Sequence, residues 1–205
     1  MFRYFIANKP YNMICQFTPD YERQRTLANL NFAFSKDVYP IGRLDIDSEG
    51  LLLMTNDRKL NHTLLNPQFA HVRTYLAQVQ ETPIEEKLQQ FRNGLQVKIE
   101  KKLINTLPCQ CRVVEDLTPF FNGKEVWERD PPPIPSAYKP MSWLEVALIE
   151  GKYRQVRRMC AKIDHPCLRL IRVKIANLTL GDLPVNDVLE LEHDFVYHQL
   201  GLNQI

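Results

Sequence analysis

The sequence has no long hydrophobic run and almost no net charge. No apolar stretch approaches the ~20 residues that a membrane-spanning helix requires. Near the N-terminus stand Arg3 and Lys9, where a secretory signal peptide would have an uninterrupted apolar core. The 26 lysines and arginines nearly balance the 24 aspartates and glutamates, so the total charge alone indicates no nucleic-acid partner. We expect a cytoplasmic monomer without membrane contact, whose 205 residues can bury one good-sized core or two small ones.

The sequence also lacks the cysteine patterns of disulfide-rich and zinc-binding proteins. Its five cysteines are odd in number and irregularly spaced, and Cys109-x-Cys111 is not the spacing of a zinc knuckle. No metal-ligand pattern joins them to the histidines, which are His62, His71, His165, His193 and His198. We therefore expect reduced thiols and no bound metal.

Charge is distributed unevenly along the chain. Residues 176–205 contain five acidic residues and no lysine or arginine, whereas residues 150–175 contain eight basic residues against two acidic ones. The basic residues are Lys152, Arg154, Arg157, Arg158, Lys162, Arg169, Arg172 and Lys174. A local basic patch is sufficient to bind a polyanion, although a solvated helix face with salt bridges has a similar composition.

The arginine-rich part of this region has the pattern of an amphipathic helix at residues 153–163. Apolar residues spaced three and four apart predict one buried stripe. This stripe consists of Val156, Met159, Cys160 and Ile163. Arginines with the same spacing, expected to share the exposed face, are Arg154, Arg157 and Arg158. Neighbouring guanidinium groups repel one another unless an anion lies among them, and guanidinium matches phosphate oxygens in bidentate geometry. The helix pattern therefore favours phosphate binding.

Residues 42–57 crowd acidic side chains beside an arginine. The acids are Asp45, Asp47, Glu49 and Asp57. Because like charges repel, this density indicates a metal site, a catalytic carboxylate or a turn bonded to its own backbone. A calcium loop is disfavoured because Asn56 stands where a bidentate glutamate is required. Turn formers account for part of the segment. Arg43, two residues before Asp45, would lie on the same side of an extended stretch and hold Asp45 ionised as a nucleophile or base.

Five sequence blocks occur in the order typical of one enzyme family. The blocks are Asn8–Tyr11, Gly42–Asp45 with Ser48–Leu53, Arg73–Tyr75, Glu150–Met159 and Leu168–Arg172. With them the chain resembles the bacterial ribosomal RNA pseudouridine synthases, in the branch typified by the small-subunit uridine enzyme and in particular its E-type group, which acts on large-subunit RNA. One departure is Asn12, which stands where the family usually has glycine; asparagine tolerates the left-handed backbone that a turn there requires.

The resemblance implies isomerisation of a uridine in ribosomal RNA to pseudouridine without a cofactor. Asp45 matches the family's essential aspartate, acting on the sugar C1′ or on the ring, and Arg43 would keep it charged. Tyr75 matches the tyrosine that stacks on the flipped base, Arg157 the basic residue that pairs with the aspartate, and Leu170 the apolar residue against the base. Candidate phosphate contacts are Lys9, Arg73, Arg154, Arg158 and Arg172.

Other functions remain as alternatives. A non-catalytic RNA-binding or ribosome-assembly protein could use the same fold, but it would have no need for a carboxylate facing a polyanion. A glycosidase needs a second acid at a defined separation; Asp47 or Glu49 would have to supply it, and the neighbours are leucines where a sugar cleft has aromatic residues. Without the resemblance, Tyr75 and Leu170 would be taken for core residues. The E-type resemblance suggests one large-subunit site and leaves the uridine itself undetermined.

The expected fold is α+β, with a mixed, largely antiparallel central sheet flanked by helices. Expected strands cover residues 2–7, 51–54, 75–80, 143–149 and 168–180. Expected helices follow Asp57 as far as Pro67, run from a capping box at 82–85 to Gly94, and cover 153–163. We expect a single catalytic domain at residues 1–205 with two subdomains divided near 80–85, no N-terminal RNA-binding module, and a proline-rich insertion or linker at 115–141.

Overall fold

The computed structural model describes residues 1–66, 68, 71–134 and 139–202. The strands are β1 (Tyr4–Lys9), β2 (Tyr39–Pro40), β3 (Glu49–Thr55), β4 (Arg73–Gln80), β5 (Gln96–Ile99), β6 (Lys102–Asn105), β7 (Gln110–Val114), β8 (Met141–Leu148), β9 (Cys167–Ile175), β10 (Leu178–Thr179) and β11 (Val188–Leu191). The helices are α1 (Arg58–Leu65), α2 (Glu85–Arg92), α3 (Gln155–Lys162) and α4 (His193–Gln199), with short 3₁₀ turns η1 (Leu27–Asn29) and η3 (Thr118–Phe121).

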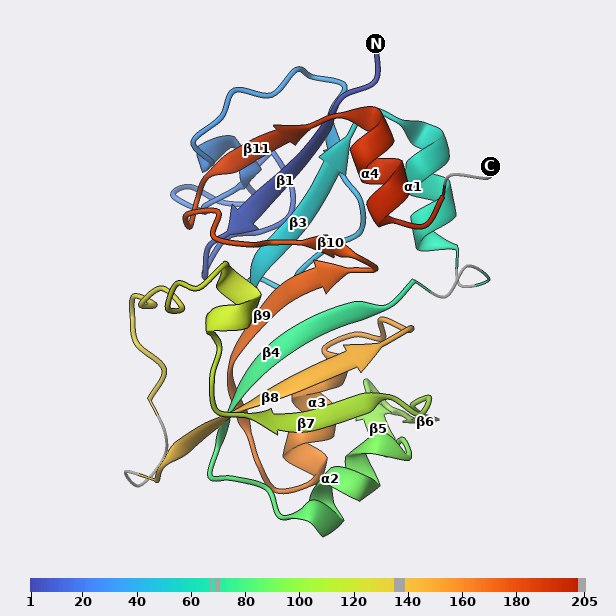
Figure 1. Ribbon diagram of the computed structural model, residues 1–205. Helices are drawn as coiled ribbons and strands as arrows, with labels where there is room; N and C mark the ends of the chain where they lie inside the picture. Colours follow the sequence, from blue (N-terminus) through green and yellow to red (C-terminus); the bar gives the residue numbers. More distant parts are fainter. Residues whose placement is uncertain (67, 69–70, 135–138, 203–205) are drawn as a thin grey trace.

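Within the described residues, nine strands form one twisted sheet in the order β11-β1-β3-β9-β4-β8-β7, with β2 on β3 and β10 on β9 (Figure 1). All pairs are antiparallel except β3 with β9. A separate hairpin is formed by β5 and β6. The prediction of an α+β fold with a largely antiparallel sheet is confirmed.

Two local predictions differ from the structure. The segment 168–180 is not one strand, because Ala176 adopts a left-handed φ of 49° and turns the chain back to pair β10 with β9. The capping box at 82–85 does not form, since the N-cap of α2 is Ile84 and no side chain caps it. Acidic residues in the first turn of α2 complement the helix dipole instead.

Helix α1 begins as the sequence indicates. The Asp57 carboxylate accepts hydrogen bonds from the backbone N–H groups of Lys59 and Leu60, at 2.9 and 3.1 Å, which satisfies two N–H groups without helical partners. The helix ends at Leu65. Pro67, where we expected the stop, lies outside the described residues.

Side chains alternate across the sheet and fill three cores. On one face, β1 and β3 pack with α1, α4 and η3 in a cluster that we call the α1–α4 core. On the other face lie two separate clusters: the N-terminal core, in which Phe5 and Leu52 pack with residues 13–44, and the α2–α3 core over β4 and β8. Because β3 is covered on both faces, its residues 51–54 form a continuous apolar run and do not alternate.

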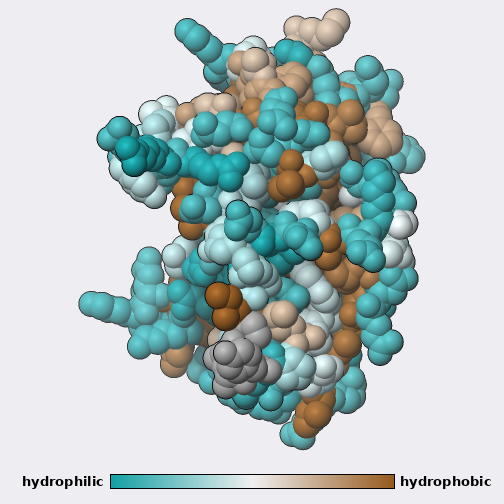
Figure 2. Space-filling model, turned by 90° about the vertical axis from the view of Figure 1, so that its left-hand side faces the viewer, coloured by the Kyte–Doolittle hydropathy of each residue, from teal (hydrophilic) through white to brown (hydrophobic). Residues whose placement is uncertain are grey.

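The α2–α3 core and the N-terminal core leave a cleft between them. Tyr75 of β4 packs against both clusters and lies at the bottom of this cleft. In Figure 2 the surface is hollowed between an upper and a lower lobe on the side where these two cores lie. The sheet itself runs without interruption beneath both lobes. The predicted division into subdomains near residues 80–85 stays a prediction.

Helix α3 forms with its predicted apolar stripe buried, but the arginines do not share an exposed face. Arg154 precedes the helix as its N-cap, with a left-handed φ of 52°. This backbone turns its side chain away from the helical direction. Only 10% of the Arg157 side chain is exposed. The three arginines therefore make separate contacts, which are described below with the site.

The described part of the proline-rich segment packs against the sheet. Phe121 is buried in the α1–α4 core, and Trp127 packs beside it, with ring centroids 5.6 Å apart. Arg129 donates a hydrogen bond to the carbonyl of Leu168 in β9, at 3.0 Å. Residues 118–129 therefore cover the sheet instead of spanning solvent, while residues 135–138 lie outside the described chain.

Gly50 marks the closest approach of β3 and β9. Its φ is +96°, and a Cβ there would overlap the carbonyl oxygen of Arg172 and lie 2.8 Å from Cγ2 of Ile171. We predict that Gly50→Ala lowers the free energy of unfolding by at least about 2 kcal/mol, because backbone strain and overpacking add. Urea denaturation measures this loss. Gly151→Ala, with open space around its Cβ, is the matched control and should change stability by less than about 0.5 kcal/mol; equal losses would contradict the explanation.

Candidate active site

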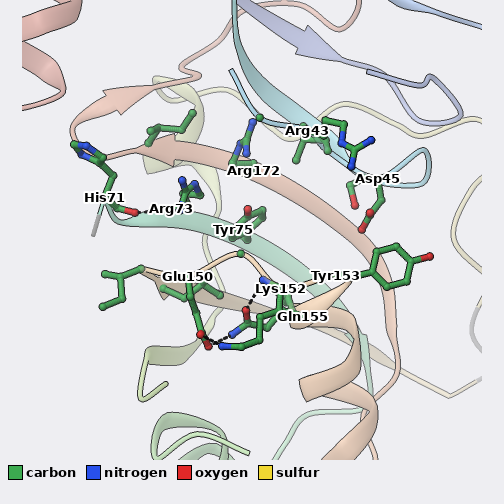
Figure 3. A pocket seen from close by; sticks show the side chains of 18 of the residues that line it. Arg43, Asp45, His71, Arg73, Tyr75, Glu150, Lys152, Tyr153, Gln155 and Arg172 are labelled. Atoms are coloured by element: carbon green, nitrogen blue, oxygen red, sulfur yellow. Dashed lines mark hydrogen bonds and ion pairs between the residues drawn. The ribbon is translucent and has the colours of Figure 1, made fainter. Parts of the chain in front are cut away.

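A cavity of about 750 Å³ lies in the cleft between the N-terminal and α2–α3 cores. Its bottom is formed by Tyr75 of β4 together with Leu170 and Arg172 of β9. The turn that precedes β3, with Arg43 and Asp45, forms one wall, and the segment from β8 to α3 forms the other (Figure 3). A cavity of this size is typical of small-ligand sites.

The turn before β3 is held by its own backbone and by a cysteine. The N–H of Ser48 donates to the carbonyl of Asp45 at 3.0 Å. Leu44 is buried in the N-terminal core, and its N–H and carbonyl both contact the Cys15 thiol, at 3.2 and 3.3 Å. With Leu44 anchored inward, Arg43 is exposed and Asp45 faces the cavity.

Asp47 is neutralised by two arginines. Nη1 and Nη2 of Arg154 donate to its two carboxylate oxygens at 2.8 and 2.6 Å. Arg157 donates to the Asp47 carbonyl at 2.6 Å, and its Nε lies 3.4 Å from Oδ2. Burial raises the pKa of Asp47, but the bonds and charges of these arginines outweigh burial and leave the pKa below its usual value.

Glu49 is buried beneath the site and fully paired. Only 1% of its side chain is exposed, and Arg169 bonds both of its oxygens, at 2.8 and 2.9 Å. The indole of Trp127 donates a third bond to Glu49 at 2.9 Å, while its carbonyl accepts one from Arg169. Glu49 thus joins β3, β9 and residues 118–129, and it has no free oxygen for chemistry.

Asp45 is the acid of this turn that remains available to a substrate. Its side chain is 30% exposed and lines the cavity. In the part of the chain that the structure describes, its carboxylate has no hydrogen bond, and the nearest guanidinium atom is Nη1 of Arg154, at 3.9 Å. The arrangement keeps a cation near Asp45 without blocking its oxygens.

Two expected contacts of Asp45 are absent from the described residues. No ion pair joins it to Arg43, whose side chain is exposed. Arg157 does not pair with Asp45 either, because its guanidinium bonds the carbonyls of Asp47 and Cys167. The cation beside Asp45 is that of Arg154, which we expected among the phosphate contacts.

The two residues expected against the base both line the cavity. Tyr75 is half-buried in its bottom, and Leu170 lies beside it with 5% exposure. Tyr75 pairs across the strands with Arg172, and a register shift at Thr74 lies next to it. Sequence alone could not separate these residues from ordinary core positions, and the cavity provides the difference.

Lys9 and Arg158 do not occupy the positions expected of phosphate contacts. Lys9 is completely buried, its Nζ donates to the Pro10 carbonyl at 2.9 Å, and burial lowers its pKa to about 8 despite nearby carboxylates. Unlike the other candidates in β4 and β9, it does not line the cavity, so it is not placed to contact a phosphate there. Arg158 bonds the carbonyls of Tyr153 and Lys98 outside the cavity. The remaining candidates, Arg73, Arg154 and Arg172, all line the cavity.

The wall between β8 and α3 contains a polar network that our sequence reasoning missed. Glu150 accepts hydrogen bonds from Gln155 at 2.6 Å and from the N–H of Leu107 at 2.8 Å, and it also pairs with Lys152. Next to this network, Tyr153 projects beside Asp45 with 60% exposure (Figure 3). An acid at the end of a strand, followed five residues later by glutamine in the first helical turn, is the signal that could have identified this wall.

Neither metal ligands nor membrane spans appear in the described chain. No three histidine, cysteine, aspartate or glutamate residues are grouped there as metal ligands. No described helix is long and apolar enough to cross a membrane.

Known proteins of one enzyme family are similar to this chain over most of its length. The family model described as RNA pseudouridylate synthase matches residues 3–162. Ribosomal large subunit pseudouridine synthase E of Vibrio vulnificus (strain CMCP6) is 41% identical over 186 residues, which cover 91% of this chain and 74% of that protein. The enzyme of the same name from Xanthomonas axonopodis pv. citri (strain 306) is 40% identical over 179 residues, which cover 87% of this chain and 88% of that protein.

A solved structure shares the fold. A crystal structure of a pseudouridylate synthase superimposes with a TM-score of 0.75 over 97% of this chain and 74% of that chain, at 22% sequence identity. The resemblance that we drew from five short blocks is therefore confirmed across most of the sequence. Both the family match and the identity to the curated relatives show that this chain belongs to the RNA pseudouridylate synthase family, whose members are isomerases.

Proposed function

We propose that this chain isomerises one uridine of large-subunit ribosomal RNA to pseudouridine, with Asp45 as the nucleophile. The observation that supports this most is that only one of three neighbouring acids is left without a hydrogen-bonded arginine in the described structure. Asp47 and Glu49 are paired with arginines, whereas Asp45 faces the cavity with its oxygens unbonded in the described structure. The large-subunit substrate is supported by the relatives at 40–41% identity, which are named for the large subunit.

The reaction requires no group other than the substrate and these side chains. The N1–C1′ bond of uridine breaks, the base turns, C5 bonds to C1′, and the C5 proton leaves while N1 gains one, so the atoms balance. Asp45 would form a transient bond either to C1′ or to the ring and then be released. Tyr75 lies where it could assist removal of the C5 proton.

The uridine has to leave any helical stack to reach Asp45. Flipping a base costs a few kcal/mol of free energy. Stacking on an aromatic side chain stabilises the flipped base by about 1–3 kcal/mol. Tyr75 and Leu170 form the bottom of the cavity where the flipped base would lie. Arg154, held against Asp47, would keep its positive charge beside Asp45 as the reaction proceeds.

The alternatives fit the site less well. A binding-only protein would gain nothing from an unpaired carboxylate in a cavity that faces RNA, because it repels phosphates. A glycosidase would need a second acid, and both neighbours of Asp45 in the turn are held by arginines. We also propose that the protein acts as a monomer, in the cytoplasm where it would meet ribosomal RNA.

Pseudouridine mapping of both ribosomal RNAs from cells lacking the protein tests the proposal. We expect one pseudouridine to disappear from the large-subunit RNA and to return when the wild-type gene is restored. An unchanged map would refute the ribosomal substrate. Loss of a small-subunit pseudouridine would keep the activity and correct the substrate.

A further inference from the structure

Arg172 is a buried arginine in the cavity with an unpaired nitrogen. Only 3% of its surface is exposed, and its Nε donates to the Leu51 carbonyl at 2.8 Å. Its Nη2 is buried and has no hydrogen-bond partner among the described residues. A buried guanidinium N–H without an acceptor costs free energy, so this atom indicates a partner that the protein itself does not provide.

Arg73 adds a second guanidinium to the same cavity. It donates to the carbonyls of Leu64 and His71, at 3.2 and 3.5 Å, and its other N–H groups have no hydrogen-bond partner among the described residues. Burial lowers the pKa of Arg73, and the positive charge of Arg172 lowers it further. Within the described chain, neither arginine has a carboxylate within 4 Å.

The two arginines come from adjacent strands beside the expected base position. Arg73 stands two residues before Tyr75 on β4, and Arg172 is the register partner of Tyr75 on β9. In Figure 3 Arg73 lies on the side of Tyr75 toward His71 and Arg172 lies above Tyr75, while Tyr153 projects at the opposite end, near Asp45. A ligand that reaches both arginines and Asp45 has to extend along the cavity.

We propose that Arg73 and Arg172 form a subsite for the backbone phosphate that adjoins the flipped uridine. The inference rests on the proposed function, because it assumes that RNA occupies this cavity. Two like charges without a counter-ion are destabilising at short range, and a phosphate both neutralises them and accepts several bonds from guanidinium groups. A uracil carbonyl would satisfy Nη2 of Arg172 but would leave both charges uncompensated.

Salt-dependent RNA binding distinguishes these ligands. All proteins contain Asp45→Asn to block turnover, the probe is a transcript of large-subunit ribosomal RNA, and Kd is measured over a series of KCl concentrations. We expect Arg73→Gln and Arg172→Gln each to weaken binding about 10- to 100-fold at low salt. Each should also reduce the slope of log K against log [KCl] by about 0.7, the value for one lost phosphate contact on a single strand.

Control variants distinguish loss of the phosphate contact from loss of folding and from loss of a positive charge elsewhere on the protein. Arg112→Gln removes an arginine of β7 that is paired with Glu145 outside the cavity, and it should leave the slope unchanged. Arg172→Lys keeps the charge and should retain the slope even if affinity falls. Circular dichroism melting checks that each variant is folded, and Arg73, which is half-buried, tests the subsite even if Arg172→Gln unfolds.

The possible results of these experiments test the phosphate subsite and the proposed function separately. Weaker binding with an unchanged slope would mean a base contact or a purely structural role and would refute the phosphate subsite, as would unchanged affinity. Mapping of the same transcript after incubation with protein that retains Asp45 tests the activity separately. A transcript that is bound with the expected slopes but not modified would refute the proposed function and leave the subsite in place.

Discussion

Replacing Asp45 by asparagine is expected to reduce pseudouridine formation by at least about 1,000-fold, because an amide cannot act as the nucleophile or base. RNA affinity should stay within a few-fold of wild type, since the carboxylate makes no hydrogen bond within the described chain that folding or binding depends on. Stability should change by no more than about 0.5 kcal/mol, as for other partly exposed residues without partners. Product is measured by mapping, affinity by equilibrium binding and stability by thermal melting.

The matched control is the same change two residues further along. Asp47→Asn removes the charge that holds Arg154 and Arg157 but leaves an oxygen that still accepts a hydrogen bond. We expect product formation to fall about 10- to 100-fold, because the turn and the arginines shift without losing the nucleophile. If Asp45→Asn forms product at the wild-type rate while Asp47→Asn forms none, the nucleophile is Asp47 and the assignment is wrong.

Arg169→Met is expected to give the largest loss of stability. The substitution leaves Glu49, with 1% side-chain exposure, without its guanidinium partner and with only the Trp127 indole as a described donor. Breaking one side of a buried ion pair costs about 3–5 kcal/mol. For a chain of this size the melting temperature should fall by about 6–20 °C, which calorimetry or urea denaturation would show.

Two further variants separate loss of the buried pair from loss of an arginine. Arg112→Met breaks the more exposed pair with Glu145 and should cost no more than about 1 kcal/mol. Glu49→Leu combined with Arg169→Met removes both buried charges and should recover much of the loss. A loss no greater for Arg169→Met than for Arg112→Met would show that the buried pair does not hold β3, β9 and Trp127 together.

Several elements that depend on nearby residues were predictable, although α4 and the β5–β6 hairpin were not predicted. The apolar spacing of Val156, Met159 and Ile163 predicted α3, and Asp57 predicted the start of α1. Each strand expected from its composition appears within a few residues of the observed bounds, except that 168–180 divides at Ala176. These features follow from side chains a few positions apart, so the sequence contains them directly.

The candidate site was predictable only in part. The sequence indicated the turn with Asp45 and, by resemblance, Tyr75 and Leu170, and all three line one cavity. It did not indicate that Lys9 would be buried or that residues 118–129 would cover the sheet through Trp127. Burial of a polar side chain depends on what packs above it, which short-range spacing does not encode.

The cluster of acids and the cluster of arginines can be read from the sequence, whereas the pairing of each acid with its arginine depends on the folded structure. Local spacing favoured Arg43 beside Asp45, yet the observed partners are separated along the chain, 107 residues for Asp47 with Arg154 and 120 for Glu49 with Arg169. The parallel pairing of β3 with β9 and the position of α3 bring them together. Ion pairing depends on distances of a few ångströms in space, and those distances exist only once the sheet is assembled.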